Sequence, residues 1–236
     1  NVDSIEASSA SSIITLYSAT TVPTGISTIP ISVNDTTISA TSANTINTYT
    51  TDTVTVTATT IEGGVATIET ALAASVADGN NGIFYEVTLA GEDALVATVT
   101  DTTVDAEALN DVNDATAGLV TVSSATSISG TATEVAAAYT ANDAEGGITG
   151  LDAVNITLTD ATVTLAQLNL AIADTTGKVT ATLETTALAN IVAADGNGRT
   201  IGGTGHSITI GLTDNTVSAA NLNTLDAITT ETITID

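Results

Sequence analysis

The sequence contains no cysteine, methionine or tryptophan, and only two of its 236 residues, Lys178 and Arg199, are basic. Without cysteine, the chain forms no disulfide, no thiolate metal site and no cysteine nucleophile. With so few cations to neutralise phosphates, we expect no binding to nucleic acid and no docking on an anionic membrane. The formal net charge of −25 predicts a polyanion that is most stable in high salt or with divalent cations.

Aromatic residues make up only 2% of the chain, although hydrophobic residues make up 43%. The core must therefore be built from Ala, Val, Ile and Leu, whose small side chains suit thin and regular layers. The high apolar content and the charged content of 12% argue against disorder. No stretch approaches the roughly 20 apolar residues of a membrane span, so we expect no membrane insertion.

Reactive side chains are too scarce for an enzyme. His206 is the only histidine, with no second histidine and no Ser/Asp pairing, so we expect it to be incidental. Lyases of acidic sugars need cations at the site, but Lys178 and Arg199 are far apart in the sequence, and we expect both to be solvated. Two carboxylates can hydrolyse a glycoside, but sugar sites favour aromatic platforms. The sequence therefore predicts no catalytic residues and no enzymatic activity.

One stretch of 23 residues occurs four times without a gap. The copies begin at residues 34, 100, 159 and 213, so they are 66, 59 and 54 residues apart. Each copy has a helix N-cap candidate followed by Ala and Leu at helical spacing, and most end in an alternation such as Val-Thr-Val. Gln167 adds the spacing of a capping box after Thr164. The N-cap candidates are Ser39, Asp105, Thr164 and Ser218.

The segments between the copies have the same order of strand, Ala-rich helix, loop and strand. Strands joined by a short covering helix must run parallel in one sheet. The sequence therefore predicts a repeat β-solenoid with parallel strands and short helices on one side. A plain parallel β-helix and tandem β-sandwich domains are the alternatives. The four repeats would occupy residues 34–236, and residues 1–33 would form a degenerate coil, a cap or an assembly segment.

Short loops rich in Asp, Asn and Gly follow three of the expected helices. One interpretation is a helix stop, in which Gly or Asn adopts the left-handed conformation. The other is a calcium loop, because carboxylate and amide oxygens surround this cation in proteins. The candidate calcium ligands are Asp78, Asn80, Asp143, Glu145, Asp195 and Asn197.

An aspartate is the second residue of every copy. These residues are Asp35, Asp101, Asp160 and Asp214. Stacked carboxylates would repel one another unless a cation or hydroxyl groups lay between them. We therefore expect each aspartate to form a turn by bonding to its own backbone.

The phrases TDTTV at 100–104 and SISGTATEVAAAYTA at 127–141 resemble the Ala/Thr-rich repeats of very large bacterial surface proteins. Such proteins, with relatives in marine bacteria and cyanobacteria, include S-layer proteins, surface filaments and giant adhesins. The resemblance covers roughly residues 34–236. It implies export from the cell, calcium-dependent order and a structural role.

These observations predict an extracellular structural protein at a bacterial cell surface, in a self-assembling filament or surface layer. Its partners would be copies of itself, joined end to end or laterally. The final stretch, ETITID, alternates like a strand and has no polar cap, so we expect further chain or another subunit to cover it. The first alternative is a ligand-binding adhesin segment that grips a glycan with its variable loops, and the second is a segment of a phage tail fibre.

Overall fold

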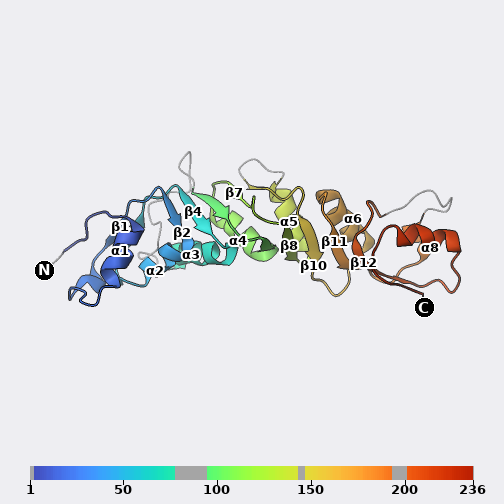
Figure 1. Cartoon of the computed structure of the whole chain (residues 1–236), viewed down its shortest axis with the longest axis horizontal. Helices are drawn as coiled ribbons and strands as arrows, with labels where there is room; N and C mark the ends of the chain where they lie inside the picture. The colour runs from blue at the N-terminus through green and yellow to red at the C-terminus, as the bar shows by residue number, and fades with distance from the viewer. Residues whose placement is uncertain (1–2, 78–94, 143–146, 193–200, 236) are drawn as a thin grey trace. The chain divides into compact units, whose positions relative to one another are not determined.

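The computed structural model describes residues 3–77, 95–142, 147–192 and 201–235. Within these residues the chain is a mixed α/β fold, in which every strand pair is parallel (Figure 1). The chain divides into two compact units. The first comprises Asn1–Asp101, Ala108–Ser124 and Ala141–Thr149, and the second comprises Thr102–Glu107, Ala125–Thr140 and Gly150–Asp236.

The predicted β-solenoid is wrong. The strands form three separate parallel sheets of two, five and six strands rather than one closed solenoid. The helices argue equally against a plain β-helix, and the parallel pairing argues against tandem β-sandwiches. The physical reason lies in the turns, because residues 34–36 separate β1 from β2 and the two strands join different sheets.

The first unit holds the sheets of two and five strands, and the second holds the sheet of six. The smallest sheet pairs β1 (Ile31–Val33) with β3 (Val54–Val56). The five-stranded sheet has the order β2 (Thr37–Ser39), β4 (Thr60–Gly63), β5 (Val96–Val99), β7 (Val120–Thr121) and β9 (Ile148–Thr149). The six-stranded sheet has the order β13 (Ile233–Ile235), β12 (Ser207–Leu212), β11 (Val179–Thr182), β10 (Asn155–Leu158), β8 (Ser127–Gly130) and β6 (Thr103–Asp105).

Short helices connect these strands. They are α1 (Ala10–Tyr17), α2 (Ala40–Asn47), α3 (Val65–Ala77), α4 (Ala106–Ala115), α5 (Ala132–Asn142), α6 (Leu165–Asp174), α7 (Leu188–Ile191) and α8 (Ala219–Asp226), with a 3-10 turn at Ile26–Thr28. In the first unit α1 packs beside α2, and α2 packs beside α3. A helix after a strand returns the chain to the end of the sheet at which that strand began. The next strand therefore runs in the same direction, which is why the strand pairs are parallel.

The N-cap predictions from the repeated stretch are confirmed at three helices. The side chains of Ser39, Thr164 and Ser218 each accept a hydrogen bond from a backbone N–H in the first turn of α2, α6 and α8. Thr164 and Gln167 form the predicted capping box. Asp105 directly precedes α4. These local signals therefore determine where the helices begin.

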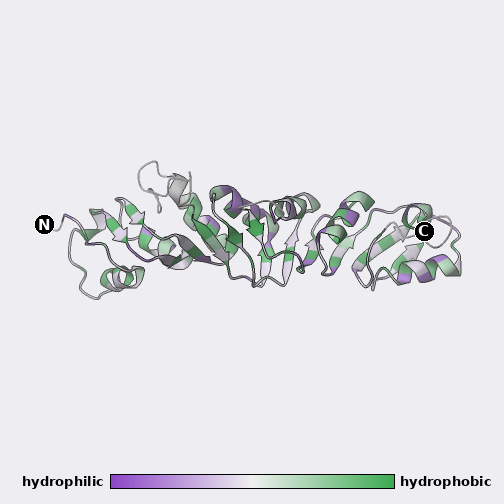
Figure 2. Ribbon diagram, turned by 90° about the horizontal axis from the view of Figure 1, so that it is seen from above, coloured by the Kyte–Doolittle hydropathy of each residue, from purple (hydrophilic) through white to green (hydrophobic). Residues whose placement is uncertain are grey.

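Aliphatic side chains fill the core, as the composition predicts. Along β12, Ile208, Ile210 and Leu212 are fully buried, while Ser207 and Thr209 lie on the other face. Figure 2 shows green, hydrophobic residues alternating with paler residues of intermediate hydropathy along strands. Tyr139 is the one buried aromatic residue among those described. Its hydroxyl donates a hydrogen bond to the carbonyl of Leu151 at 3.0 Å. Burial raises the pKa of Tyr139 to about 12, so this hydroxyl remains a donor.

Candidate functional site

The six candidate calcium ligands lie outside the described residues. They are Asp78, Asn80, Asp143, Glu145, Asp195 and Asn197. Among the residues that the structure describes, no group of three or more His, Cys, Asp or Glu side chains is placed to hold a metal ion. Calcium binding by these loops therefore stays a prediction.

The four repeated aspartates share one contact that sequence reasoning missed. Each carboxylate accepts a hydrogen bond from the backbone N–H of the first residue of an earlier helix. The pairs are Ala10 N–H to Asp35 at 2.6 Å, Val65 to Asp101 at 2.5 Å, Ala132 to Asp160 at 2.7 Å and Leu188 to Asp214 at 2.6 Å. The predicted turn, in which each aspartate bonds to its own backbone, is therefore wrong.

This contact places a negative charge at the N-terminus of α1, α3, α5 and α7, where the helix dipole favours it. It also satisfies one of the backbone N–H groups that a helix leaves without an internal partner. At α7 it is the main cap, because Ala187 in the N-cap position offers no side-chain hydrogen bond. At α3 the carboxylate of Asp101 lies against Gly64, where a β-carbon would come within 3.1 Å of it.

Four buried threonines form a second shared contact, again at one position of each copy. Each hydroxyl donates to a backbone carbonyl 21 residues earlier. The pairs are Thr50 to Ile29, Thr116 to Leu95, Thr175 to Val154 and Thr229 to Ile208. Each hydroxyl oxygen also accepts a hydrogen bond from the backbone N–H two residues later in the chain. The four donors are Asp52, Gly118, Gly177 and Glu231. The threonines thus satisfy backbone groups that would otherwise be buried without partners.

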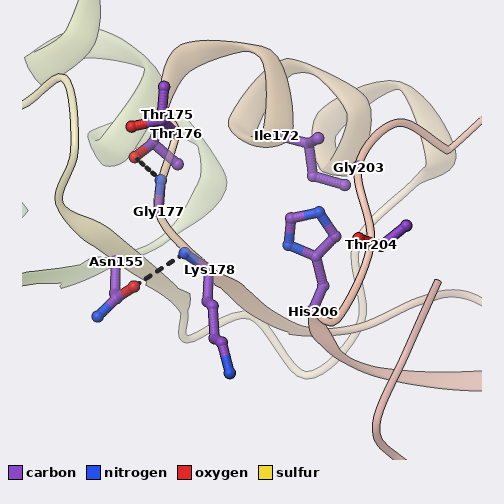
Figure 3. Close-up of a pocket in the computed structure, with 9 residues that line it drawn as sticks. All are labelled: Asn155, Ile172, Thr175, Thr176, Gly177, Lys178, Gly203, Thr204 and His206. Carbon is purple, nitrogen blue, oxygen red and sulfur yellow. Dashed lines mark hydrogen bonds between the residues drawn. The ribbon is translucent and has the colours of Figure 1, made fainter. Parts of the chain in front are cut away.

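Besides the four threonines, the described residues include one more buried polar side chain, that of His206. It lines a pocket in the second unit. Its side chain is only 5% exposed. The cavity has a volume of about 450 Å³, and Asn155, Thr175, Lys178 and Thr204 line it with the ring. Figure 3 shows the imidazole with one nitrogen turned toward Ile172 and Gly203. The pairing of Thr180 with Ser207 brings β11 beside this histidine, and that pairing is not visible in the sequence.

The hydrogen bonds of His206 determine its tautomer. The backbone N–H of Val179 donates to Nδ1 at 3.1 Å, so the neutral ring carries its proton on Nε2. Nε2 is buried and has no hydrogen-bond partner of normal geometry within the described residues. Burial lowers the pKa of His206, and the positive charge of Lys178 lowers it further, while the backbone of Gly202 opposes the shift. The ring is therefore neutral at pH 7.

Acid is expected to destabilise the chain through this histidine. Because the pKa is lower in the folded state than the ordinary value of 6.5, the unfolded chain binds more protons as the pH falls below about 6.5. Stability should be insensitive to His206 above that pH, fall below it and level off under the folded-state pKa. Urea unfolding from about pH 7.5 to 5 measures this. His206→Gln, which cannot take up this proton, is the control, and equal slopes in both proteins would contradict the assignment.

No family model matches the sequence, and no curated protein or solved structure matches it significantly. Within the described residues, no helix is both long enough and apolar enough to cross a membrane.

Proposed function

We propose that this chain is an extracellular structural protein that assembles with copies of itself into a filament or surface layer at a bacterial cell surface. The observation that carries the proposal is the use of the repeated polar residues. All four repeated aspartates and all four buried threonines bond to the chain's own backbone. The repeated side chains therefore stabilise the fold, as expected of a protein with a structural role.

An edge strand supports assembly between copies. Among the described residues, β13 lies at one edge of the six-stranded sheet and pairs with β12. Its side chains are half-buried or exposed, and Ile235 is 46% exposed. An edge of this kind presents backbone N–H and C=O groups that can pair with a strand of another chain. We propose a second copy as the occupant. Because each copy carries a net charge of −25, assembly should need salt or divalent cations to screen the repulsion.

Assembly should depend on Ile235. We expect the purified chain to form filaments or sheets in calcium that dissolve in EDTA, as seen by light scattering and negative-stain microscopy. Ile235→Lys should remove most of the assembled material, because a lysine on an edge strand opposes strand addition. Leu170→Lys is the matched control, since Leu170 is 50% exposed but lies on α6. A folded monomer in both solutions would overturn the proposal, and equal loss in both variants would overturn the role of β13.

A ligand-binding adhesin segment is the second candidate. The pocket lined by Asn155, Lys178 and His206 favours it, because its volume of about 450 Å³ is that of a small-molecule site.

A further inference from the structure

We propose that Tyr17 and Tyr49 form a site of oxidative cross-linking, at which a one-electron oxidant joins their rings as dityrosine. The oxidant would be of the class of a peroxidase supplied with hydrogen peroxide. The proposal goes beyond the structural role above, because it assigns a covalent modification to two side chains within a single chain.

The two rings lie in a parallel stack in the first unit. Their centroids are 4.7 Å apart, and their planes differ by only 3°. Tyr17 is the last residue of α1, and Tyr49 follows the end of α2, which packs beside α1 (Figure 1). Aromatic pairs favour offset stacks of this kind. The fold therefore brings together two phenols that are 32 residues apart in the sequence.

The pair is both held in place and accessible. The hydroxyl of Tyr17 donates to the carbonyl of Ile26 at 2.8 Å, and the hydroxyl of Tyr49 lies 3.4 Å from Oγ of Ser18. Both tyrosine side chains are half-buried, so part of each ring faces solvent. Two reactants held together in this way react as if in a single molecule, without the need to meet by diffusion.

The parallel geometry suits the coupling of two radicals. Each phenol gives one electron and one proton to the oxidant and becomes a phenoxyl radical. The unpaired electron occupies π orbitals perpendicular to the ring, including those at the carbons beside the C–O bond, so parallel rings present these orbitals to each other. One C–C bond forms between two such carbons, and each of them then loses its hydrogen as a proton while its oxygen regains one. One molecule of hydrogen peroxide takes up the two electrons and two protons and leaves as two molecules of water.

Peroxidase with limiting hydrogen peroxide tests the proposal on the 236-residue chain, at high dilution in EDTA so that the outcome is independent of assembly. We expect dityrosine fluorescence from a monomer that has lost two hydrogen atoms by intact mass. Tandem mass spectrometry should place the link between Tyr17 and Tyr49. The absence of a monomeric product, with cross-linked dimers or nothing in its place, would overturn the proposal.

Phenylalanine variants identify the residues that react. Tyr17→Phe and Tyr49→Phe should each abolish the monomeric product, because phenylalanine keeps the stacked ring but forms no phenoxyl radical. Tyr85→Phe is the matched control and should retain the product. Tyr85 lies outside the described residues, and the remaining tyrosine, Tyr139, is buried. Survival of the monomeric product in Tyr17→Phe, or its loss in Tyr85→Phe, would assign the link to other residues and overturn the proposal.

The link should also stabilise α1. A covalent bond between Tyr17 and Tyr49 closes a loop of chain and so reduces the conformational freedom of the opened state. The amides of α1 should therefore exchange with solvent more slowly in the cross-linked chain, and the same treatment should change nothing in Tyr49→Phe. Unchanged exchange of these amides after cross-linking would overturn the stabilising role of the link.

Discussion

Replacing the four repeated aspartates with asparagine is expected to lower the free energy of unfolding by about 1–4 kcal/mol in total. The change removes a negative charge from the N-termini of α1, α3, α5 and α7 and exchanges a carboxylate acceptor for a weaker amide oxygen. Each site should contribute about 0.3–1 kcal/mol, and sites that share no partner should add. Urea unfolding followed by circular dichroism measures the total. The replaced residues are Asp35, Asp101, Asp160 and Asp214.

The matched control removes the same four charges from exposed positions. Relief of repulsion in a chain of net charge −25 should leave the control as stable as the parent, or slightly more stable. Hydrogen exchange adds a local readout, because the first amides of the four helices should lose protection only in the first variant. Equal stability of the two variants would contradict the capping role. The control residues are Asp3, Asp111, Asp114 and Asp226.

Thr229→Val is expected to lower the free energy of unfolding by about 2–5 kcal/mol, the largest effect of any single change considered. Valine has nearly the shape of threonine, so the effect comes from hydrogen bonding rather than packing. The hydroxyl of Thr229, which is 4% exposed, donates to the Ile208 carbonyl and accepts from the N–H groups of Ile208 and Glu231. The valine would leave these backbone groups buried without a partner, which urea unfolding measures.

The next residue in the chain provides the control. Thr230 is exposed, and its hydroxyl donates one longer hydrogen bond, 3.2 Å, to the His206 carbonyl. Thr230→Val should therefore cost less than about 1 kcal/mol. Faster amide exchange at Ile208 in Thr229→Val alone would locate the loss. Similar stability losses in both variants would show that the buried hydroxyl has no special role.

Helix starts are predictable from this sequence, and the choice of sheet is not. Ser39, Thr164 and Ser218 cap helices because the signal lies within a few residues of the helix that it starts. The strand stretches are equally visible as Val-Thr alternation. Their assignment to separate sheets depends on the geometry of short turns, which places two neighbouring strands in different sheets. No distinctive residue pattern marks these turns in the sequence. The solenoid prediction failed at this step.

The site illustrates the same limit. Asp101 looks like a turn residue, because its partner, the Val65 N–H, lies 36 residues earlier. No local pattern links such residues, although the recurrence of the aspartate in four copies signals a shared role. Likewise, His206 is a lone histidine in the sequence, and only the register of β11 against β12 brings Lys178 and Val179 near it. The calcium loops remain a prediction of the sequence alone.

The aspartate contacts also have a consequence for how the chain folds as it is synthesised. Each links a helix to a carboxylate that follows it by 25, 36, 28 or 26 residues. As the chain emerges from the ribosome with its N-terminus first, the start of α1 has no such partner until Asp35 has emerged. The N-terminal contacts of α1, α3, α5 and α7 therefore form only after a later segment of the chain has been made. The native contacts accumulate from the N-terminus toward the C-terminus.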